Sequence, residues 1–306
     1  MTEEKRQIWF LFESFVRGMK LGDFAKADIF SETADIVCSH TGSGTGPKDA
    51  ARLLAYPGPG PEHVKQYAEN VIFRRLGAEA RQSFHLHQLY TLHGENGEFH
   101  YFQYGGTFVL GYGKEKDGWK IESVRFDLCW TDGNTFWVKD WKLIDFHMPK
   151  RYKQVISWKT DGVCRALPRN EEEQTEEEKI RERLFLYGWV IDTEDYGLFR
   201  EIALEDVRVE DGWHEIVIEG NKNWTDFLHT LNQKEPCLHH TYRITSVEIQ
   251  GDEALGRMSR LEPNRIGTKT INEDTWFLDW LTLEYEIRFR KSGEGWKMEE
   301  VRFWKK

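Results

Sequence analysis

The sequence predicts an α+β protein built from two copies of one fold. Three observations support this prediction: a segment near residue 120 recurs at the end of the chain, other segments recur at nearly the same spacing, and helical patterns precede long alternating strands in each half. At roughly 100–200 residues per domain, 306 residues suit two domains. We therefore expect two tandem cone-shaped domains, each with helices packed on a strongly curved antiparallel sheet.

The repeat is clearest in the two segments that end each half. DGWKIESVRF (residues 117–126) and EGWKMEEVRF (residues 294–303) are 177 positions apart. Three earlier pairs, LGDF with TEDY, GPKDAARLLA with GNKNWTDFLH, and LGAEA with QGDEA, are 172 to 174 positions apart. A spacing that changes so little indicates two diverged copies with small loop differences. Copies of this length are domains rather than solenoid units.

Each half shows the same order of elements. In the second half an amphipathic helix begins near Thr175, a plausible N-cap with Glu178 three residues later. A short helix at the acidic turn, a short strand and a helix after Gly46 or Gly220 follow. Alternation of apolar and polar residues then predicts four strands. These are residues 66–76, 80–92, 99–114 and 119–128 in the first half, and 240–249, 254–261, 281–290 and 296–304 in the second.

The domain boundaries follow from the repeat and from composition. We assign residues 1–160 to a first domain with a C-terminal extension, residues 161–174 to a linker, and residues 175–306 to a second domain. The extension is rich in aromatic side chains, and we expect it to pack on the first domain or to bridge the two. These side chains are Trp130, Phe136, Trp137, Trp141 and Phe146.

Composition excludes several classes of function. The net charge of −10 and the scattered Lys and Arg argue against nucleic acid and anionic membranes as partners. The four cysteines have no CxxC spacing, which favours free thiols in a reducing compartment. No signal peptide or membrane-spanning pattern is present, so we expect a cytoplasmic location. The 14% aromatic content suits deep pockets or large apolar interfaces.

The ordered set of a helix, a short strand, a helix at a glycine and long strands ending in GWK and VRF resembles a known superfamily. It is similar to the nuclear-transport-factor-two-like proteins, in particular the SnoaL-like branch with scytalone dehydratase, ketosteroid isomerase and polyketide cyclases. The resemblance covers roughly residues 1–128 and 175–306. It implies an activity that needs no cofactor. It also implies that the two domains form, within one chain, the pair that this family often makes as a homodimer.

The resemblance also implies a site in the second domain. In dehydratase-like members a Tyr and an Asp lie on the first helix, and a His begins the third strand. The segment LFLYGWVIDTED (residues 184–195) and the following His239-His240 supply this set as Tyr187, Asp192 and His240. The first copy has Phe15, Lys20 and Gln66 at these three places, so the implied chemistry belongs to the second domain only.

A Tyr–Asp–His set suits acid–base chemistry beside a carbonyl group. Neutral His240 would remove a proton, Asp192 would orient its ring, and Tyr187 would donate a hydrogen bond to the developing oxyanion. We therefore expect a lyase, isomerase or cyclase acting on a hydrophobic hydroxylated or carbonyl small molecule, with no cofactor and no metal. The candidate substrate-binding residues are Trp189, Trp213, Tyr242, Met258 and Arg260.

Alternative interpretations remain open. An Asp after a helix is more often a turn residue than a catalytic one, and a His at a strand start is more often structural. Both domains would then be non-catalytic binding or scaffold modules. A third hypothesis places a metal on His85 and His87, which share one face of a strand, with His40 nearby. Two half-buried histidines with ordinary hydrogen bonds in a sheet explain that pair more simply. A small-molecule ligand is the expected partner, and a homo-oligomer is compatible with either function.

Overall fold

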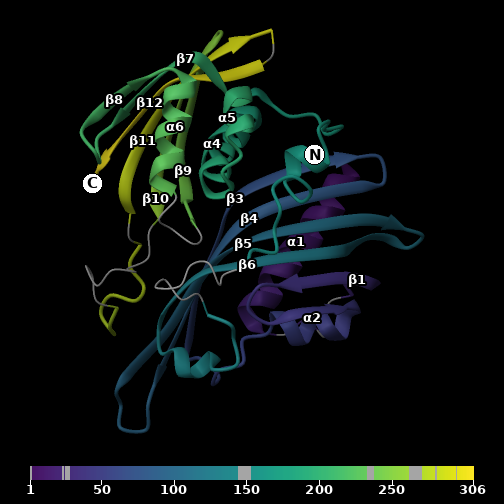
Figure 1. Ribbon diagram of the computed structural model, residues 1–306. Helices are drawn as coiled ribbons and strands as arrows, with labels where there is room; N and C mark the ends of the chain where they lie inside the picture. The colour runs from purple at the N-terminus through teal and green to yellow at the C-terminus, as the bar shows by residue number, and fades with distance from the viewer. Residues whose placement is uncertain are drawn as a thin grey trace. The chain divides into compact units, whose positions relative to one another are not determined.

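The chain forms two compact units in the computed structural model, which describes residues 2–22, 24, 28–143, 153–232, 238–261, 271–279, 281–293 and 295–306 (Figure 1). Domain 1 comprises residues 1–173 and 270–277, and domain 2 comprises residues 174–269 and 278–306. Each domain has its own six-stranded sheet, ordered β2-β1-β6-β5-β4-β3 in domain 1 and β8-β7-β12-β11-β10-β9 in domain 2. The matching order confirms the two copies of one fold that the repeat predicts.

Domain 1 starts with a long helix and continues into a sheet whose last four strands are long. Its helices are α1 (Glu3–Leu21), α2 (Gly46–Leu54), the 3₁₀ helix η1 (Thr135–Val138) and α3 (Val163–Ala166). Its strands are β1 (Phe30–Cys38), β2 (Gly42–Thr45), β3 (His63–Leu76), β4 (Glu79–His93), β5 (Phe99–Glu115) and β6 (Gly118–Gly133).

Among the described residues, domain 2 repeats the order of elements from α1 to β6, with one short helix added between its first helix and its first strand. Its helices are α4 (Glu176–Thr193), α5 (Tyr196–Ile202) and α6 (Asn221–Asn232). Its strands are β7 (Ala203–Asp211), β8 (Ile216–Glu219), β9 (Thr241–Gln250), β10 (Glu253–Leu261), β11 (Leu281–Ser292) and β12 (Gly295–Lys305). The four predicted final strands of each half are confirmed, with ends that differ by a few residues.

Both sheets are mixed and strongly curled. Neighbouring strands are antiparallel except for the pairs β1–β6 and β7–β12, which are parallel. Each sheet stays open, because its two edge strands do not pair with each other. In domain 2 the helices α4, α5 and α6 pack against the sheet (Figure 1). The α+β fold class with curved sheets is therefore confirmed.

The core of domain 1 is a stack of aromatic rings under α1. Phe15 of α1 packs edge-on against Phe84 and Phe108, at ring-centroid distances of 6.2 and 5.6 Å. Phe84 and Phe108 stack on each other at 5.0 Å, and Phe108 stacks on Phe126 at 4.0 Å. Burying each such ring contributes about 1.5–3 kcal/mol, so this stack anchors the helix on the sheet.

The described part of the aromatic extension packs on domain 1. The buried carboxylate of Asp127 accepts hydrogen bonds from the backbone N–H groups of Val155 and Ile156, at 2.8 and 2.9 Å. The indole of Trp141 packs edge-on against Tyr104 at 5.5 Å. Phe136 is exposed, and Phe146 lies outside the described residues.

The start of α4 is fixed by the capping box that the sequence predicts. Thr175 Oγ1 accepts a hydrogen bond from the backbone N–H of Glu178 at 3.2 Å. The Glu178 carboxylate accepts one from the backbone N–H of Thr175 at 2.8 Å. Asp195 caps α5 in a similar way, accepting from the Leu198 N–H at 3.1 Å. These two caps define the residue at which each helix begins.

A glycine lets α4 lie close to the sheet. A Cβ atom at Gly256 of β10 would be 2.9 Å from the nearest side-chain carbon of Leu184 on α4. A larger residue there would push the helix away from β10. Because α4 carries Tyr187 and Asp192, this close approach sets the distance of both side chains from the sheet.

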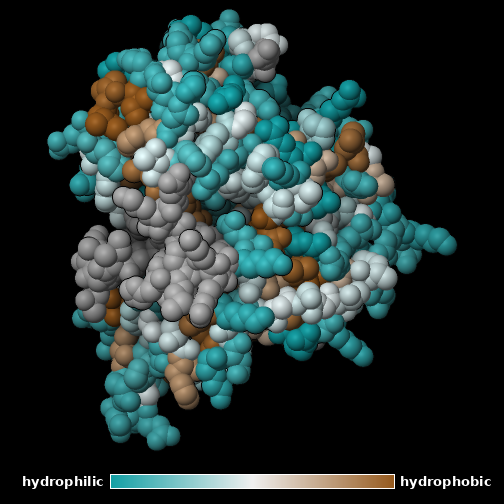
Figure 2. Space-filling view, viewed as in Figure 1, coloured by the Kyte–Doolittle hydropathy of each residue, from teal (hydrophilic) through white to brown (hydrophobic). Residues whose placement is uncertain are grey.

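The face in Figure 2 is mostly hydrophilic, with apolar patches of limited extent, which agrees with 31% charged residues in the chain. Among the helices of the described residues, none is both long and apolar enough to cross a membrane.

We predict that Thr175→Ala destabilises domain 2 by about 1 kcal/mol, because it leaves a backbone N–H in the first turn of α4 without its capping acceptor. Urea unfolding followed by circular dichroism measures the change. The matched control is Thr230→Ala on α6, whose hydroxyl donates only to the carbonyl of Asp226 one turn earlier. That substitution should stay within about 0.5 kcal/mol, and equal effects of the two would contradict the capping role.

Candidate active site

Asp192 and His240 are in direct contact. Asp192 lies in the last turn of α4, and His240 immediately precedes β9. One carboxylate oxygen of Asp192 is hydrogen-bonded to Nδ1 of His240, and the other accepts a hydrogen bond from the backbone N–H of His240 at 2.7 Å. The Asp192 side chain is 3% exposed and the His240 side chain 14%. The two contacts together hold both the backbone and the ring of His240.

The position of Asp192 explains why it needs these donors. The last turn of a helix is the negative end of the helix dipole, which disfavours a carboxylate by a few tenths of a kcal/mol to about 1 kcal/mol. A buried carboxylate also loses its hydration and requires hydrogen-bond donors in exchange. The backbone N–H and ring of His240 provide them, so helix α4 and strand β9 are joined at this point.

Tyr187 lies on the same helix, buried in a cluster of tyrosines. Its ring centroid is 6.2 Å from that of Tyr242 and 6.2 Å from that of Tyr285. Burial raises the pKa of Tyr187 well above its ordinary value, and the nearby Tyr285 and Asp211 raise it further, while the charge of Arg260 opposes them. Tyr187 is therefore a protonated hydrogen-bond donor at neutral pH.

Strand register places five further side chains on the same face of the sheet. Tyr242 is opposite Arg260, Tyr285 is opposite Phe303, and Phe303 is opposite Asp211. Arg260 is also opposite Leu283, two residues from Tyr285, and residues two apart on a strand share a face. All five project from one face, near the end of the sheet where β9 begins and β7 ends. His240 lies at that same end.

The remaining predicted substrate-binding residues occupy different surroundings. Met258 is buried and opposite Tyr285, so it belongs to the same face of the sheet. Trp189 is buried but two residues from Tyr187 on α4, about 200° around the helix. Trp213 is 48% exposed in the β7–β8 turn, with the ammonium of Lys305 4.4 Å from the ring centroid. The structure thus groups Tyr242, Met258 and Arg260 and leaves the two tryptophans outside that group.

Sequence reasoning missed a second Asp–His pair. Asp211 ends β7, and one of its carboxylate oxygens lies 2.6 Å from Nδ1 of His214. The other accepts hydrogen bonds from the backbone N–H groups of Trp213 and His214, each at 2.9 Å. The sequence contains this pair as an Asp three residues before a His at the end of a predicted strand. Only the fold shows that Asp211 faces the tyrosine cluster.

Domain 1 has a hydrogen-bonded amide in the corresponding place. Phe15 is buried among aromatic rings, and Lys20 is exposed. The side-chain N–H₂ of Gln66 donates to the carbonyl oxygen of Val16 at 3.0 Å and to the side-chain oxygen of Gln88 at 2.9 Å. An amide is not a base near neutral pH, so Gln66 supplies no counterpart of His240.

The three histidines of the metal hypothesis lie in separate environments. His85 contacts the side-chain amide of Asn70 at 3.2 Å, and His87 contacts that of Gln103 at 3.0 Å. His40 is buried against Trp141, and burial lowers its pKa to about 3. Within the described part of the chain, no group of three or more His, Cys, Asp or Glu side chains is placed to hold a metal ion.

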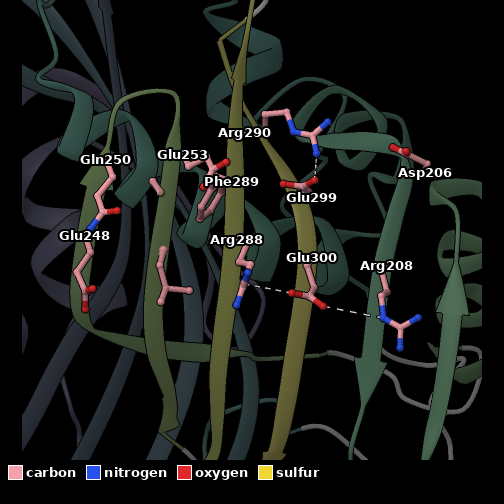
Figure 3. A pocket seen from close by; sticks show the side chains of 12 residues that line it. Asp206, Arg208, Glu248, Gln250, Glu253, Arg288, Phe289, Arg290, Glu299 and Glu300 are labelled. Carbon is pink, nitrogen blue, oxygen red and sulfur yellow. Dashed lines mark hydrogen bonds and ion pairs between the residues drawn. The ribbon is translucent and has the colours of Figure 1, made fainter.

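A groove of about 640 Å³ lies on domain 2, but on the opposite face of its sheet (Figure 3). Arg208 and Arg288 approach Glu300 from two sides, at 3.9 and 3.3 Å, and Arg290 pairs with Glu299. Arg208 alternates with the buried Val207 and Val209, which confirms that it projects outward. Five carboxylates and three arginines line the groove, and each of the three arginines is paired with Glu299 or Glu300.

We predict that alkaline pH destabilises domain 2 less when Tyr187 is replaced by Phe. Below the ordinary tyrosine pKa of 10.0 the phenol is protonated in both folded and unfolded chains, so its titration does not change the free energy of unfolding with pH. Above that pH the unfolded chain loses the proton while the buried phenol keeps it, and stability falls by up to about 1.4 kcal/mol per pH unit.

Urea unfolding between about pH 8 and about pH 11 measures this loss. Wild type should show a steeper decline above about pH 10 than Tyr187→Phe, and the two should run parallel below about pH 9. Identical slopes in both ranges would show that Tyr187 does not retain its proton through burial.

Comparison with known proteins finds a family match for one of the two domains. Residues 172–302 match the family model of the SnoaL-like domain. No curated protein matches the sequence of this chain.

Solved structures are similar to the chain over the length of one domain. A protein from Kribbella flavida is 15% identical, covering 44% of this chain and 97% of its own, with a TM-score of 0.38. A hexachlorocyclohexane dehydrochlorinase from Novosphingobium barchaimii is 14% identical, covering 42% and 88%, with a TM-score of 0.35. A protein proposed to be a scytalone dehydratase, from Novosphingobium aromaticivorans, is 15% identical, covering 42% and 86%, with a TM-score of 0.35.

The family match extends from just before α4 to β12, and so includes every element that positions Asp192, His240 and the tyrosine cluster. Domain 2 is therefore the part of the chain that is similar to the SnoaL-like family.

Proposed function

We propose that domain 2 is a lyase or isomerase that removes a proton beside a carbonyl group of a hydrophobic small molecule. The observation that carries this proposal is the double contact of Asp192 with the ring and the backbone of His240. A turn residue would need only the backbone contact. The additional contact with Nδ1 orients the imidazole, which is the arrangement that a general base requires.

His240 acts as the base in this proposal. Asp192 binds Nδ1, so Nε2 is the nitrogen that takes the substrate proton. When it does, the ring becomes an imidazolium, and the neighbouring carboxylate stabilises the new positive charge. General-base catalysis of this kind contributes typically 10²–10⁴-fold to the rate.

Tyr187 and Arg260 would stabilise the enolate that forms. Tyr187 is protonated at neutral pH, because burial raises its pKa further above the ordinary value of 10.0, and the phenol would donate a hydrogen bond to the carbonyl oxygen as negative charge develops. Burial raises the pKa of both Tyr187 and Tyr242, and the positive charge of Arg260 opposes this rise in both, so Arg260 acts on the same region. A cation that favours a phenolate there also favours an enolate.

The surroundings indicate a hydrophobic substrate. Met258, Tyr285 and Phe303 share the inner face of the sheet with Tyr242, and Tyr285 stacks on Phe303 at 5.1 Å. Apolar walls exclude water and strengthen the interaction of the donors with the developing charge. All the groups named in these steps are protein side chains, so the proposed chemistry proceeds without a cofactor.

We predict that His240→Ala abolishes catalysed hydrogen exchange in β-tetralone, a ketone with acidic protons beside its carbonyl. Wild type should exchange these protons for deuterium in D₂O, followed by proton NMR. The rate should fall by about 10²–10⁴-fold in His240→Ala and by about tenfold or more in Asp192→Asn, because the amide cannot stabilise the imidazolium.

The matched controls are His229→Ala and Asp226→Asn, two exposed positions on α6. Both should exchange at the wild-type rate. If His240→Ala and Asp192→Asn also keep that rate, the acid–base assignment is wrong.

A second candidate function is ligand binding without chemistry. It is favoured by the burial of Tyr187, Tyr242 and Met258, whose side chains fill much of the inner face. Under this hypothesis β-tetralone signals would broaden on addition of the protein, while exchange in wild type would not exceed that in His240→Ala. The rate of β-tetralone exchange in wild type therefore distinguishes the two candidate functions.

A further inference from the structure

Trp119 of domain 1 and Trp296 of domain 2 occupy the same place in the two copies of the fold. Each is the second residue of its strand, β6 or β12, and each is opposite a lysine of the preceding strand, Lys114 or Lys291. Both side chains are buried, with 4% and 2% of their surface exposed. The surroundings of the two indoles can therefore be compared directly.

The two indole N–H groups differ in their hydrogen bonding. Nε1 of Trp296 donates to the carboxylate of Glu176 at 2.7 Å, and Lys291 contacts the same carboxylate at 2.8 Å. Nε1 of Trp119 is equally buried, but it has no hydrogen-bond partner among the described residues. A buried indole N–H usually has a partner, and one without requires an explanation. The Trp119 N–H is therefore a donor that a molecule from outside the chain could use.

The acceptor used in domain 2 is directed elsewhere in domain 1. Glu3 is the counterpart of Glu176, because each is the first residue of the first helix of its domain. Glu3 pairs with Arg6 within α1 at 3.0 Å instead. The lysine of domain 1, Lys114, pairs with Glu4. This rearrangement of ion pairs explains why the indole of domain 1 is left without an acceptor.

A groove of about 680 Å³ lies beside this indole, between α1 and the start of β6. Trp119 lines the side formed by β6, and Trp9, Phe10 and Leu11 line the side formed by α1. Glu3 lines the groove too, and its counterpart is the residue to which the other indole N–H points, so the Trp119 N–H is directed at the groove. Phe10 is 66% exposed. Exposed aromatic surface beside a buried donor is typical of a binding site.

The groove carries an excess of negative charge. Its charged residues are Glu3, Arg6, Glu13, Asp28, Asp117 and Lys120. Arg6 pairs with Glu3, and Lys120 pairs with Asp28 at 2.7 Å. Glu13 and Asp117 are exposed, and neither has an ion-pair partner in the part of the chain that the structure describes. A ligand with basic groups beside these two carboxylates is therefore favoured.

We propose that this groove binds a basic peptide segment of a partner protein. The Trp119 N–H donates to a backbone carbonyl oxygen of the segment, an apolar side chain of the segment packs on Phe10, and lysine or arginine side chains pair with Glu13 and Asp117. The carboxylate at the other indole is accompanied by two lysines, whereas the excess charge here is negative. A neutral carbonyl oxygen is therefore the acceptor that fits. This site lies in domain 1 and is independent of the chemistry proposed for domain 2.

The test uses the full-length chain labelled with ¹⁵N at tryptophan, so that each of its 13 indole N–H groups contributes one signal to a proton–nitrogen spectrum. Trp119→Phe identifies the Trp119 signal by its loss. The probe is the capped tetrapeptide acetyl-Arg-Phe-Leu-Lys-amide. We expect it to move the Trp119 signal downfield in a saturable way, because the N–H gains an acceptor, while the Trp296 signal stays in place.

Phe10→Ala should weaken binding of this peptide by about tenfold or more, because truncating a central aromatic contact costs affinity of that order. Glu13→Gln should weaken it by about twofold to fivefold, as expected for one exposed ion pair. The matched controls are Phe136→Ala and Glu79→Gln, two exposed positions of domain 1 outside the groove. Both should bind the peptide as wild type does.

Two control peptides separate the contributions of charge and apolar surface. Acetyl-Glu-Phe-Leu-Glu-amide reverses the charge, and acetyl-Arg-Gly-Gly-Lys-amide removes the apolar side chains. Each should bind about tenfold or more weakly than the probe. An acidic peptide that moves the Trp119 signal as strongly as the basic one would contradict the proposed partner.

Stability provides an independent measurement of the unpaired donor. Trp296→Phe removes a hydrogen bond to a carboxylate, whereas Trp119→Phe removes an N–H that bonds nothing among the described residues. Trp296→Phe should therefore lower the urea midpoint of unfolding more than Trp119→Phe does.

Three results would overturn the proposed site. A Trp119 signal that does not move with the basic peptide would show that the groove does not bind such a segment. Equal movement of the Trp119 and Trp296 signals, or binding that Phe10→Ala leaves unchanged, would place the peptide elsewhere on the chain. Equal losses of stability in the two Trp→Phe variants would show that the Trp119 N–H already has an acceptor within the protein.

Discussion

The arrangement of domain 2 depends on one buried carboxylate, that of Asp192. It lies at the negative end of α4, where neither the helix dipole nor the apolar surroundings favour an anion. Its bonds to the ring and the backbone of His240 compensate for this, and they join the end of the helix to the start of β9. The same bonds that make the buried charge tolerable also orient an imidazole. Under the proposed function, structural and chemical roles coincide in this single contact.

The curled sheet explains how distant segments share one site. The beginning of β9, the ends of β10, β12 and β7, and the beginning of β11 all lie at one end of the sheet, because neighbouring strands alternate in direction except at the parallel pair. Residues opposite one another then project from the same face. This brings Tyr242, Arg260, Tyr285 and Asp211 together from four strands, facing Tyr187 on α4. Each inner-face position is next to an outward-facing one, which is why the charged groove around Glu300 lies on the other side.

The two domains show how one fold can keep or lack a site. Their strand orders match, yet Phe15 and Gln66 stand where domain 2 has Tyr187 and His240. In domain 1 the helix is held by stacked phenylalanine rings and by the amides of Gln66 and Gln88. These contacts perform the same structural task, joining the first helix to the third strand. A charged pair is therefore not required by the fold, which strengthens the functional interpretation of the pair in domain 2.

The sequence by itself determined the duplication, the order of the elements and the cap at Thr175, because these depend on local patterns and on comparison of the two halves. The resemblance to a known family pointed to the set Tyr187, Asp192 and His240. Neither determined which aromatic side chains surround the site. Trp213 is exposed and Trp189 points away from Tyr187, whereas Tyr285, Asp211 and His214 face or flank the cluster. Those positions depend on strand register and on the curl of the sheet, which join residues up to about a hundred positions apart. Only the tertiary structure could bring the second Asp–His pair to the end of the sheet where His240 lies.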